Sequence, residues 1–520
     1  MIRGKMKFNC RCKTSRPQAG AALLVILALV FLAAGALAAE QASQVDVLFN
    51  QARFDLMNGH YQQALDKLEQ ARRLAPEDKR LTLWKVKVLR ALGRDKEALA
   101  LSESVLEQDP SLYGPLHFEA AQILFGQGQT ERALQHLRDA ESVQRGEALL
   151  AQMELLLQSG EYEASAIIPS RAGELKPTER QELLLKQAMA YYRNYDYDKA
   201  LESLAKAKAE APNSNTVKAI NALEKEIKLI DRPWWLGASV SYVYDSNVFL
   251  DPLYQDPAHA AASGRSDSAA LGEVWFGARL ARWSGVSLGF TGHVQYMNYF
   301  KETDASYSYW APGLYLAWGK YRWGFRLPYS FYYYYHTGRM TDWSQIHSFT
   351  PMVYWQMTSK LKTYFTGVFL RRTYFDDRSD AYHWGMVIDH VYTFSAPSNF
   401  LKLSYRYDVE DADDGISGYT GFEVTLAGGR RVWGPLSAEA GVTWARYDYD
   451  RRQEWTLNFR DFDRSDDQMR YYLELKWSLP QWWNVKLSSY YINNDSNVQS
   501  NVSPYDYNKY VLMMTITKYF

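Results

Sequence analysis

The spacing of apolar residues along the chain changes once, near Trp234. Before this position apolar residues recur every three or four positions, as in amphipathic helices; after it they alternate with polar residues, as in strands. The alternation is clearest over residues 469–478, where the apolar Leu473 and Leu475 flank the charged Glu474. The pattern therefore predicts a helical half followed by a half made of strands.

The helical half repeats itself about every 34 residues. Gly93 follows Gly59 by 34 positions, and Gly128 follows Gly93 by 35. This period, with glycine, tyrosine, alanine and proline at fixed places, resembles the tetratricopeptide repeat, whereas a generic helical bundle, the alternative, has no reason to keep it. The repeat signature comprises Gly59, Tyr61, Ala64, Pro76, Gly93, Ala98, Pro110, Gly128, Ala133, Tyr197, Ala200 and Pro212.

Each part of this signature has a physical role. The glycine ends the first helix of a pair, the alanine is small where two helices cross, and the proline stops the second helix. Because one helix pair cannot bury its apolar face alone, the units stack and leave a concave groove. We predict an α-helical solenoid over residues 45–231, with a last helix at 216–230 that caps it. Such repeats mostly bind extended peptides or partner proteins, which makes a protein the expected partner.

Residues 233–520 predict a transmembrane antiparallel β-barrel of about 14 strands. Sixteen of the 17 tryptophans lie in this part, many near strand ends, as in the aromatic girdle at a membrane surface. A soluble β-sandwich also alternates, but its core face is aliphatic and its strands are shorter. The expected strands centre near residues 239, 276, 292, 313, 328, 350, 367, 387, 404, 424, 442, 473, 491 and 513.

The two ends of the barrel predict its location. An even strand number puts both ends on one side, so the repeats are expected in the periplasm and the barrel in the outer membrane of a Gram-negative bacterium. The chain ends in Phe520 after alternating apolar residues, similar to the signal read by the barrel assembly machinery. Lys518 departs from the apolar residue usual at its position.

Residues 1–38 read as a signal peptide: a basic stretch, an apolar run over 21–37 and a small-residue cleavage pattern. The alternative is an uncleaved membrane anchor, which would also export the chain. Cys10 and Cys12 both lie in this segment, so the mature chain would hold no disulfide and no thiolate site. Removal of six basic residues leaves 53 Lys and Arg against 59 Asp and Glu, a formal charge of −6, which does not favour nucleic-acid binding.

Charged residues of both signs are predicted on the lumen face of the barrel. The candidate lumen network comprises Arg322, Arg326, Arg406, Glu439, Arg470, Glu474 and Lys476. A simple ion-selective pore would favour one sign, so the mixture suggests ion pairs that brace or narrow the lumen, unless these residues merely solvate an ordinary wall. We hypothesise that Arg322 and Arg326 bridge across the lumen to Glu439 and Glu474.

No catalytic, cofactor or metal site is predicted, and the chain is not expected to be an enzyme. Gly285–Gly289 matches a nucleophile-elbow pattern, but it lies within a strand rather than at a strand-to-helix turn. Zinc-protease and nucleotide-binding patterns are absent from the sequence. The acidic residues over 408–414 are read as a solvated outer loop, because the spacing of a calcium-binding loop fails at Ala412.

Helical repeats followed by a terminal barrel resemble the surface lipoprotein assembly modifiers over the whole mature chain. Residues 242–248, which contain Asp245-Ser246-Asn247-Val248, are similar to the start of that family's barrel, and Ser496-Asn497-Val498 followed by the terminal Phe520 is similar to its end. The resemblance implies a 14-strand barrel that helps lipoproteins or other protein cargo reach the cell surface.

Two other functions stay open. Exopolysaccharide export porins have the same order of parts, with longer repeat arrays and 16 strands. A barrel without an export role, whose repeats serve as an assembly scaffold, is the third possibility. A lumen lined by stacked aromatic rings would favour a sugar cargo, and Tyr332 and Tyr334 hint at such a track.

Overall fold

The computed structural model describes residues 43–107, 113–212, 215–248, 265–283, 285–375, 380–394, 397–413, 418–449, 464–497 and 507–520. The predicted signal peptide and Pro110 lie outside these ranges. The chain divides into two compact units. One runs up to Gln158 and includes Ile167–Leu183; the other combines Ser159–Ala166 with Leu184–Phe520.

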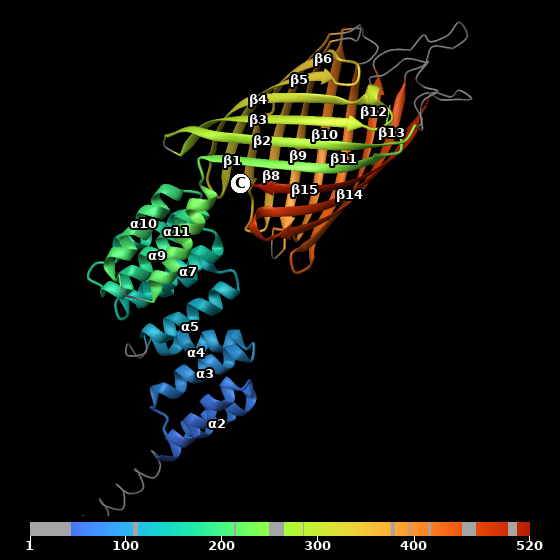
Figure 1. The fold of residues 1–520 in the computed structure, drawn as a ribbon. Coiled ribbons are helices and arrows are strands. Elements are labelled where there is room, and N and C mark those ends of the chain that lie inside the picture. The colour runs from blue at the N-terminus through green and yellow to red at the C-terminus, as the bar shows by residue number, and fades with distance from the viewer. Residues whose placement is uncertain are drawn as a thin grey trace, which may run out of the picture. The chain divides into compact units, whose positions relative to one another are not determined.

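The first half of the chain is helical (Figure 1). A helix over 43–57 is followed by α2 (Tyr61–Leu74), α3 (Lys79–Ala91), α4 (Asp95–Leu106), α5 (Tyr113–Gly126), α6 (Thr130–Ala140), α7 (Arg145–Ser159), α8 (Tyr162–Ile167), the 3-10 turn η2 (Ile168–Arg171), α9 (Pro177–Arg193), α10 (Tyr197–Glu210) and α11 (Thr216–Ile230). Among the helices that the structure describes, none has the length and apolar character needed to cross a bilayer.

The turns inside the helix pairs recur with the sequence period. Gly59, Gly93, Gly128 and Gly160 all adopt positive φ angles, between 74° and 81°. Glycine reaches this region without the steric cost of a side chain. Tyr195 occupies the equivalent turn before α10 with φ of 61°, so the last repeat makes the same turn with a residue that is strained there.

Small residues lie where the helices cross. Ala64, Ala98, Ala133 and Ala200 are completely buried, each near the start of the second helix of its pair. A larger side chain at any of these places would push two helices apart. Tyr61 begins α2, while Pro76 and Pro212 follow the ends of α2 and α10. In α11, Ile220 and Ile227 are buried against α10, as a capping helix requires.

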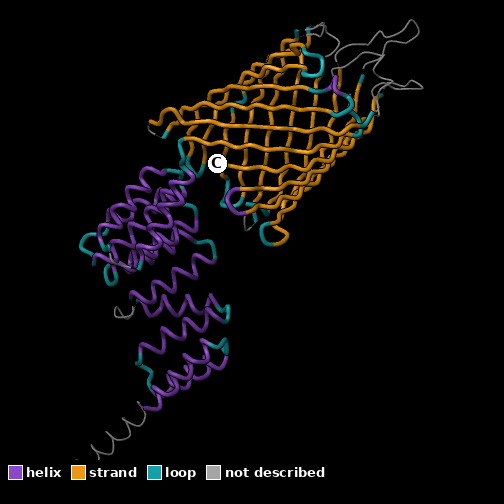
Figure 2. Tube along the Cα trace, viewed as in Figure 1, coloured by secondary structure: helices purple, strands orange, loops and turns teal. Residues whose placement is uncertain are grey.

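The second half is a single antiparallel sheet closed into a barrel (Figure 2). Its strands are β1 (Trp234–Asp245), β2 (Asp267–Trp283), β3 (Val286–Tyr299), β4 (Tyr307–Gly319), β5 (Trp323–His336), β6 (Thr341–Phe349), β7 (Met352–Gln356), β8 (Leu361–Tyr374), β9 (Ala381–Thr393), β10 (Phe400–Ala412), β11 (Tyr419–Trp433), β12 (Leu436–Tyr449), β13 (Ser465–Leu479), β14 (Trp483–Ser496) and β15 (Tyr507–Tyr519). Short 3-10 turns, η3 (Thr303–Ala305) and η4 (Pro480–Trp482), lie between strands.

The barrel wall is 14 strands around, which confirms the predicted fold. We call each of these 14 strand positions a stave. β6 and β7 both pair with β5 on one side and β8 on the other, so they are two pieces of one stave. β1 pairs with β15 from Gly237 opposite Tyr519 to Asp245 opposite Val511, which closes the sheet. A closed sheet leaves no edge whose backbone groups lack partners, the condition for a sheet inside a membrane.

The hydrogen-bonded ladder is interrupted around three prolines in neighbouring staves. The β4–β5 register skips the positions at Pro312, between Trp310 opposite Tyr333 and the next pair. Pro351 separates β6 from β7, and the ladder between these strands and β5 is interrupted at Pro351 and Pro328. Proline has no backbone N–H to donate, so each of these residues removes a hydrogen bond from the ladder.

The two faces of the barrel differ in chemistry. Along β13, Tyr471, Leu473 and Trp477 are 46–49% exposed on the outer face, where none of the described residues covers them. Outward-facing apolar residues on other strands are 40–68% exposed: Val240, Phe276, Trp310, Phe365, Trp384, Leu426, Leu487 and Met514. A continuous apolar and aromatic outer surface on a closed sheet is the surface that faces lipid in transmembrane barrels.

Candidate functional site: the barrel lumen and its helix-bearing rim

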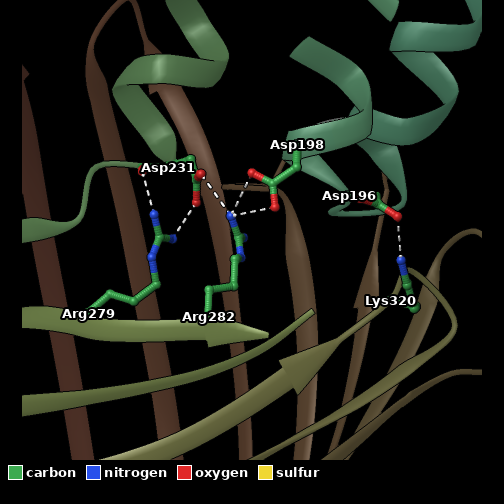
Figure 3. A network of polar contacts seen from close by, with 6 residues as sticks. All are labelled: Asp196, Asp198, Asp231, Arg279, Arg282 and Lys320. Atoms are coloured by element: carbon green, nitrogen blue, oxygen red, sulfur yellow. Dashed lines mark hydrogen bonds and ion pairs between the residues drawn. The ribbon is translucent and has the colours of Figure 1, made fainter. Parts of the chain in front are cut away.

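One rim of the barrel is joined to the last helices by ion pairs. Asp231, directly after α11, accepts hydrogen bonds from Arg279 at 2.6 Å and from Arg282 at 3.0 Å (Figure 3). Both arginines belong to β2, and Arg282 also approaches Asp198 of α10 at 3.4 Å. The aromatic ring of Tyr197 lies 6.0 Å from the same guanidinium group. Two helices and one strand therefore share a single charge cluster.

A second ion pair lies at the turn between β4 and β5. Lys320 donates to Asp196, just before α10, at 2.9 Å (Figure 3). Burial alone would raise the pKa of Asp196, but the hydrogen bonds and positive charges of Lys320 and Lys199 outweigh it and hold this pKa below its usual value of 3.8. The carboxylate is therefore charged at neutral pH and the ion pair is formed.

The same turn also makes neutral contacts with the helices. The backbone N–H of Tyr321 donates to the side-chain oxygen of Asn194 at 3.1 Å. The ring of Tyr321 packs edge-on against Tyr162 of α8, with the centroids 4.5 Å apart, and lies over Gly160. Charged, hydrogen-bonded and aromatic contacts thus fix this turn to two segments of the helical part, 160–162 and 194–196.

The structure corrects the expected role of Arg322. This residue lies in the turn rather than on the lumen wall, and its guanidinium pairs with Glu161. Arg326, four residues later, does face the lumen and lies 5.0 Å from the ring of Tyr315. Glu474 and Glu439 have other partners, so the hypothesised bridge across the lumen is wrong.

The remaining predicted charges pair along the wall instead. Arg470 pairs with Glu423 at 2.6 Å, and Arg406 pairs with Asp408 of its own strand. Glu474 binds Lys486 at 3.1 Å, and Glu439 accepts a hydrogen bond from Tyr472 at 2.8 Å. Within the part of the chain that the structure describes, Lys476 has no ion pair. These residues come from β10 to β14, so one side of the lumen carries the paired charges.

A buried polar cluster lies at the end of this charged side that is farther from the helix-bearing rim. His383 of β9 lies 3.0 Å from Asp408 and 3.4 Å from Glu410, and all three are buried. Arg372 of β8 approaches Glu410 at 3.5 Å. Asp408 and Glu410 were expected in a solvated outer loop; they lie instead in β10 and face the lumen. Each carboxylate has a cationic or hydrogen-bonding partner, which is what burial of its charge requires.

On the opposite side of the lumen, formed by β1 to β6, aromatic rings contact one another in a continuous series. Tyr309 contacts His293, Tyr332 and Tyr334, with ring centroids 5.2, 5.7 and 5.0 Å away. Tyr334 continues to Trp343 at 5.7 Å. We call this set, with Trp235 and Trp275 nearer the helix-bearing rim, the aromatic stripe. Its members are Trp235, Trp275, His293, Tyr307, Tyr309, Tyr332, Tyr334 and Trp343.

A recess of about 320 Å³ opens in the lumen wall beside the stripe. Trp235, Trp275 and Tyr332 contribute its aromatic surface, while Glu273 and Arg326 contribute charge. Sequence alternation placed Tyr332 and Tyr334 on the lumen face, but no lumen position was predicted for Trp235 or Trp275. Trp275 lies two positions after Glu273, whose carboxylate the alternation places in the lumen, and this spacing could have indicated its inward position.

No group of three or more metal-ligating side chains gathers in the described ranges. The Gly285–Gly289 motif begins at a turn and continues into β3, with no helix behind it. Phe520 follows β15, and its backbone N–H donates to Leu236 at 3.0 Å, which ties the last residue to the first strand. Lys518 donates to a backbone carbonyl in the neighbouring turn and lies 5.2 Å from the ring of Trp483.

Comparison with known families identifies the helical part. Residues 55–117 and 182–214 both match the tetratricopeptide repeat. The fold and these matches define the class of protein: a closed 14-strand barrel of the transmembrane type that carries tetratricopeptide repeats. No curated protein matches the chain.

Solved structures match one half of the chain or the other. A thermophilic tetratricopeptide repeat protein from Thermus thermophilus is 24% identical and covers 36% of this chain and 99% of its own, with a TM-score of 0.27. OccAB3 from Acinetobacter baumannii, at 8% identity, covers 55% of this chain and 99% of its own, with a TM-score of 0.31. A loop-deletion mutant of OmpT, an outer membrane protein of Vibrio cholerae, is 10% identical with the same coverage and a TM-score of 0.30.

Proposed function

We propose that this chain is an outer-membrane export protein whose repeats capture cargo at the periplasmic mouth of its barrel. The observation that carries the proposal is the attachment of α10 and α11 to one rim by Asp231, Asp196 and their basic partners. Repeats whose last helices are attached to a barrel rim raise the local concentration of captured cargo near the barrel. The closed barrel and its lipid-facing surface support a place in the outer membrane, with the repeats on the periplasmic side.

The cargo that this arrangement favours is a protein, such as a lipoprotein destined for the cell surface. Stacked tetratricopeptide units offer a groove suited to an extended peptide. The resemblance to the surface lipoprotein assembly modifiers agrees with this cargo. We expect a chain of this function to perform no catalytic step.

A second candidate, exopolysaccharide export, is favoured by the aromatic stripe. Sugar rings have apolar faces that lie well on aromatic side chains, whereas a protein cargo gives no reason for the rings to line one side of the lumen. Both candidates are export functions and share the geometry of the rim. They differ in the material that disappears from the cell surface when the protein is lost.

Surface analysis of three strains tests the proposal: the wild type, a null strain, and a strain whose protein lacks residues 43–143 but keeps its N-terminal segment and α7 to α11. We expect surface-biotinylated proteins to be lost from the null strain and from the deletion strain, although heat-modifiable gel migration shows that the shortened barrel is inserted. Loss of extracellular polysaccharide alone would select the second candidate. Unchanged proteins and polysaccharide would refute export and leave a scaffold role.

A further inference from the structure

Aromatic rings face the lumen on both sides of the barrel, but Tyr447, Tyr472 and Tyr490 on the charged side donate hydrogen bonds to its carboxylates. The interior of a transmembrane barrel is ordinarily polar on all sides. Here the staves β10 to β14 carry paired charges, while the aromatic stripe on β1 to β6 runs from Trp235, near the helix-bearing rim, to Trp343, near the other end. An aromatic girdle at the membrane surface does not explain rings that face inward along the length of the pore.

Two tryptophans of the stripe lie flat against the wall. A Cβ atom at Gly237 would lie 2.3 Å from Cε2 of Trp275 and 2.5 Å from both Cζ2 and Nε1. Three adjacent ring atoms at nearly equal distances mean that the indole covers the glycine with its face. Trp235 covers Gly277 in the same way, because the two pairs are opposite each other in the β1–β2 register. Each indole therefore turns its other face to the lumen.

Polar groups stand beside these flat rings. Glu273 accepts a hydrogen bond from Ser239 at 3.0 Å and lies 3.6 Å from His293. Arg326 contributes to the same recess, and among the residues that the structure describes no carboxylate pairs with it. Its guanidinium donors remain available to a bound molecule. The recess thus places the two flat indole rings beside the guanidinium group of Arg326 and the carboxylate of Glu273.

We infer that the aromatic stripe is a binding track for a saccharide chain. A pyranose ring has C–H groups on its faces, which suit the negative face of an aromatic ring, and hydroxyl groups at its rim, which suit Arg326, Glu273 and His293. An extended peptide has amide groups along its length, which flat tryptophans cannot satisfy. The inference goes beyond the export proposed above, because lumen binding does not depend on what the repeats capture.

The track is tested by titration calorimetry on the full chain in detergent with four hexasaccharides: β-1,4-glucan, α-1,4-glucan, β-1,4-linked N-acetylglucosamine and galacturonate. We expect at least one hexamer to bind. Trp275→Ala and Tyr332→Ala should each weaken that binding tenfold or more, since each removes a platform. Tyr333→Ala is the matched control, because this neighbour of Tyr332 points to the outer face and contacts Trp310 there. The control should bind as the unmodified protein does.

Two results would overturn the track. One is the absence of binding by all four hexamers to a protein that keeps its heat-modifiable migration. The other is competitive binding of an unstructured peptide with the same dependence on Trp275 and Tyr332. Neither result bears on the proposed export function, because the comparison of surface proteins between the three strains does not depend on saccharide binding in the lumen. Conversely, saccharide binding by a protein whose loss leaves the cell surface unchanged would refute export but retain the track.

Discussion

Lys320, in the turn between β4 and β5, donates a hydrogen bond to Asp196 at 2.9 Å, across 124 positions of the sequence. This pair joins a barrel turn to the start of α10. Because Lys199 also approaches Asp196, at 3.2 Å, the carboxylate is shared between the helix and the turn. Because Asp196 is a titratable carboxylate, the charge at this contact depends on pH.

Acidification should release this contact. The pKa of Asp196 is lowered in the folded chain, so the ion pair stabilises docking above the ordinary carboxyl pKa of 3.8 and is lost as the pH falls through the lower, folded value. We expect spin labels at Glu202→Cys and Ser359→Cys, in a chain without Cys10 and Cys12, to keep one distance at pH 7 and pH 5. The distance distribution should broaden only below pH 3.8. In Asp196→Asn the same broadening should already be present at pH 7.

Asp231 should contribute more to docking than any other single rim residue. Asp231→Ala leaves the guanidinium groups of Arg279 and Arg282, which are about 20% exposed, without their main partner. A partly buried charge that loses its partner costs roughly 1–3 kcal/mol. Hydrogen exchange at α10 and α11 should therefore accelerate at least about fivefold. Glu202→Ala, which breaks the exposed pair with Lys206, is the control and should change exchange little. Equal rates in the two variants would contradict this role.

The repeat turns should depend on backbone conformation alone. Gly128 has φ of 77° and no atom within 4 Å of a hypothetical Cβ, so Gly128→Ala meets no clash and loses only the conformation that glycine permits. We expect destabilisation of the helical part by about 1 kcal/mol. Gly126, two residues earlier at the end of α5, has the same free space without a positive φ. Gly126→Ala should be neutral or slightly stabilising. Urea unfolding of the full chain in detergent, followed by circular dichroism at 222 nm, compares the two.

Charge removal should alter ion selectivity only where the side chain faces the lumen. Arg470→Ala leaves Glu423 without its partner at 2.6 Å, so the pore should become more cation-selective in planar bilayers. Arg322→Ala should leave selectivity unchanged, because Arg322 lies in the turn and pairs with Glu161. A shift of reversal potential in Arg322→Ala as large as that in Arg470→Ala would contradict these placements.

Sequence patterns predicted the fold well because both periods are local. The recurrence of Gly59 at Gly93 and Gly128 predicts the repeats, and alternation along residues such as Leu473 and Glu474 predicts the staves. Alternation also gives the lumen-facing residues, since each side chain follows the pleat. It does not give their partners. Arg470 meets Glu423 two staves away because of the register between strands, which no short segment encodes.

The rim could not be predicted from local patterns. Arg322 obeys the alternation of the strand that follows it, yet the strand begins only at Trp323, so the residue belongs to the turn. Its partner, Glu161, is 161 positions away. The only sequence indication was the presence of basic residues at the short turns, with acidic residues such as Asp196 and Asp198 at the start of a late helix.

The three prolines in neighbouring staves make the barrel mechanically uneven. Between Pro312, Pro328 and Pro351 the ladder lacks hydrogen bonds in its interior, so the wall is more compliant along this line than between β13 and β14, whose pairing is continuous. A transverse load would spread these strands before it spread β13 and β14. Amide exchange should therefore be faster beside Thr350, whose N–H reaches Pro328 at 3.2 Å, than at the centre of β13, where the ladder is continuous.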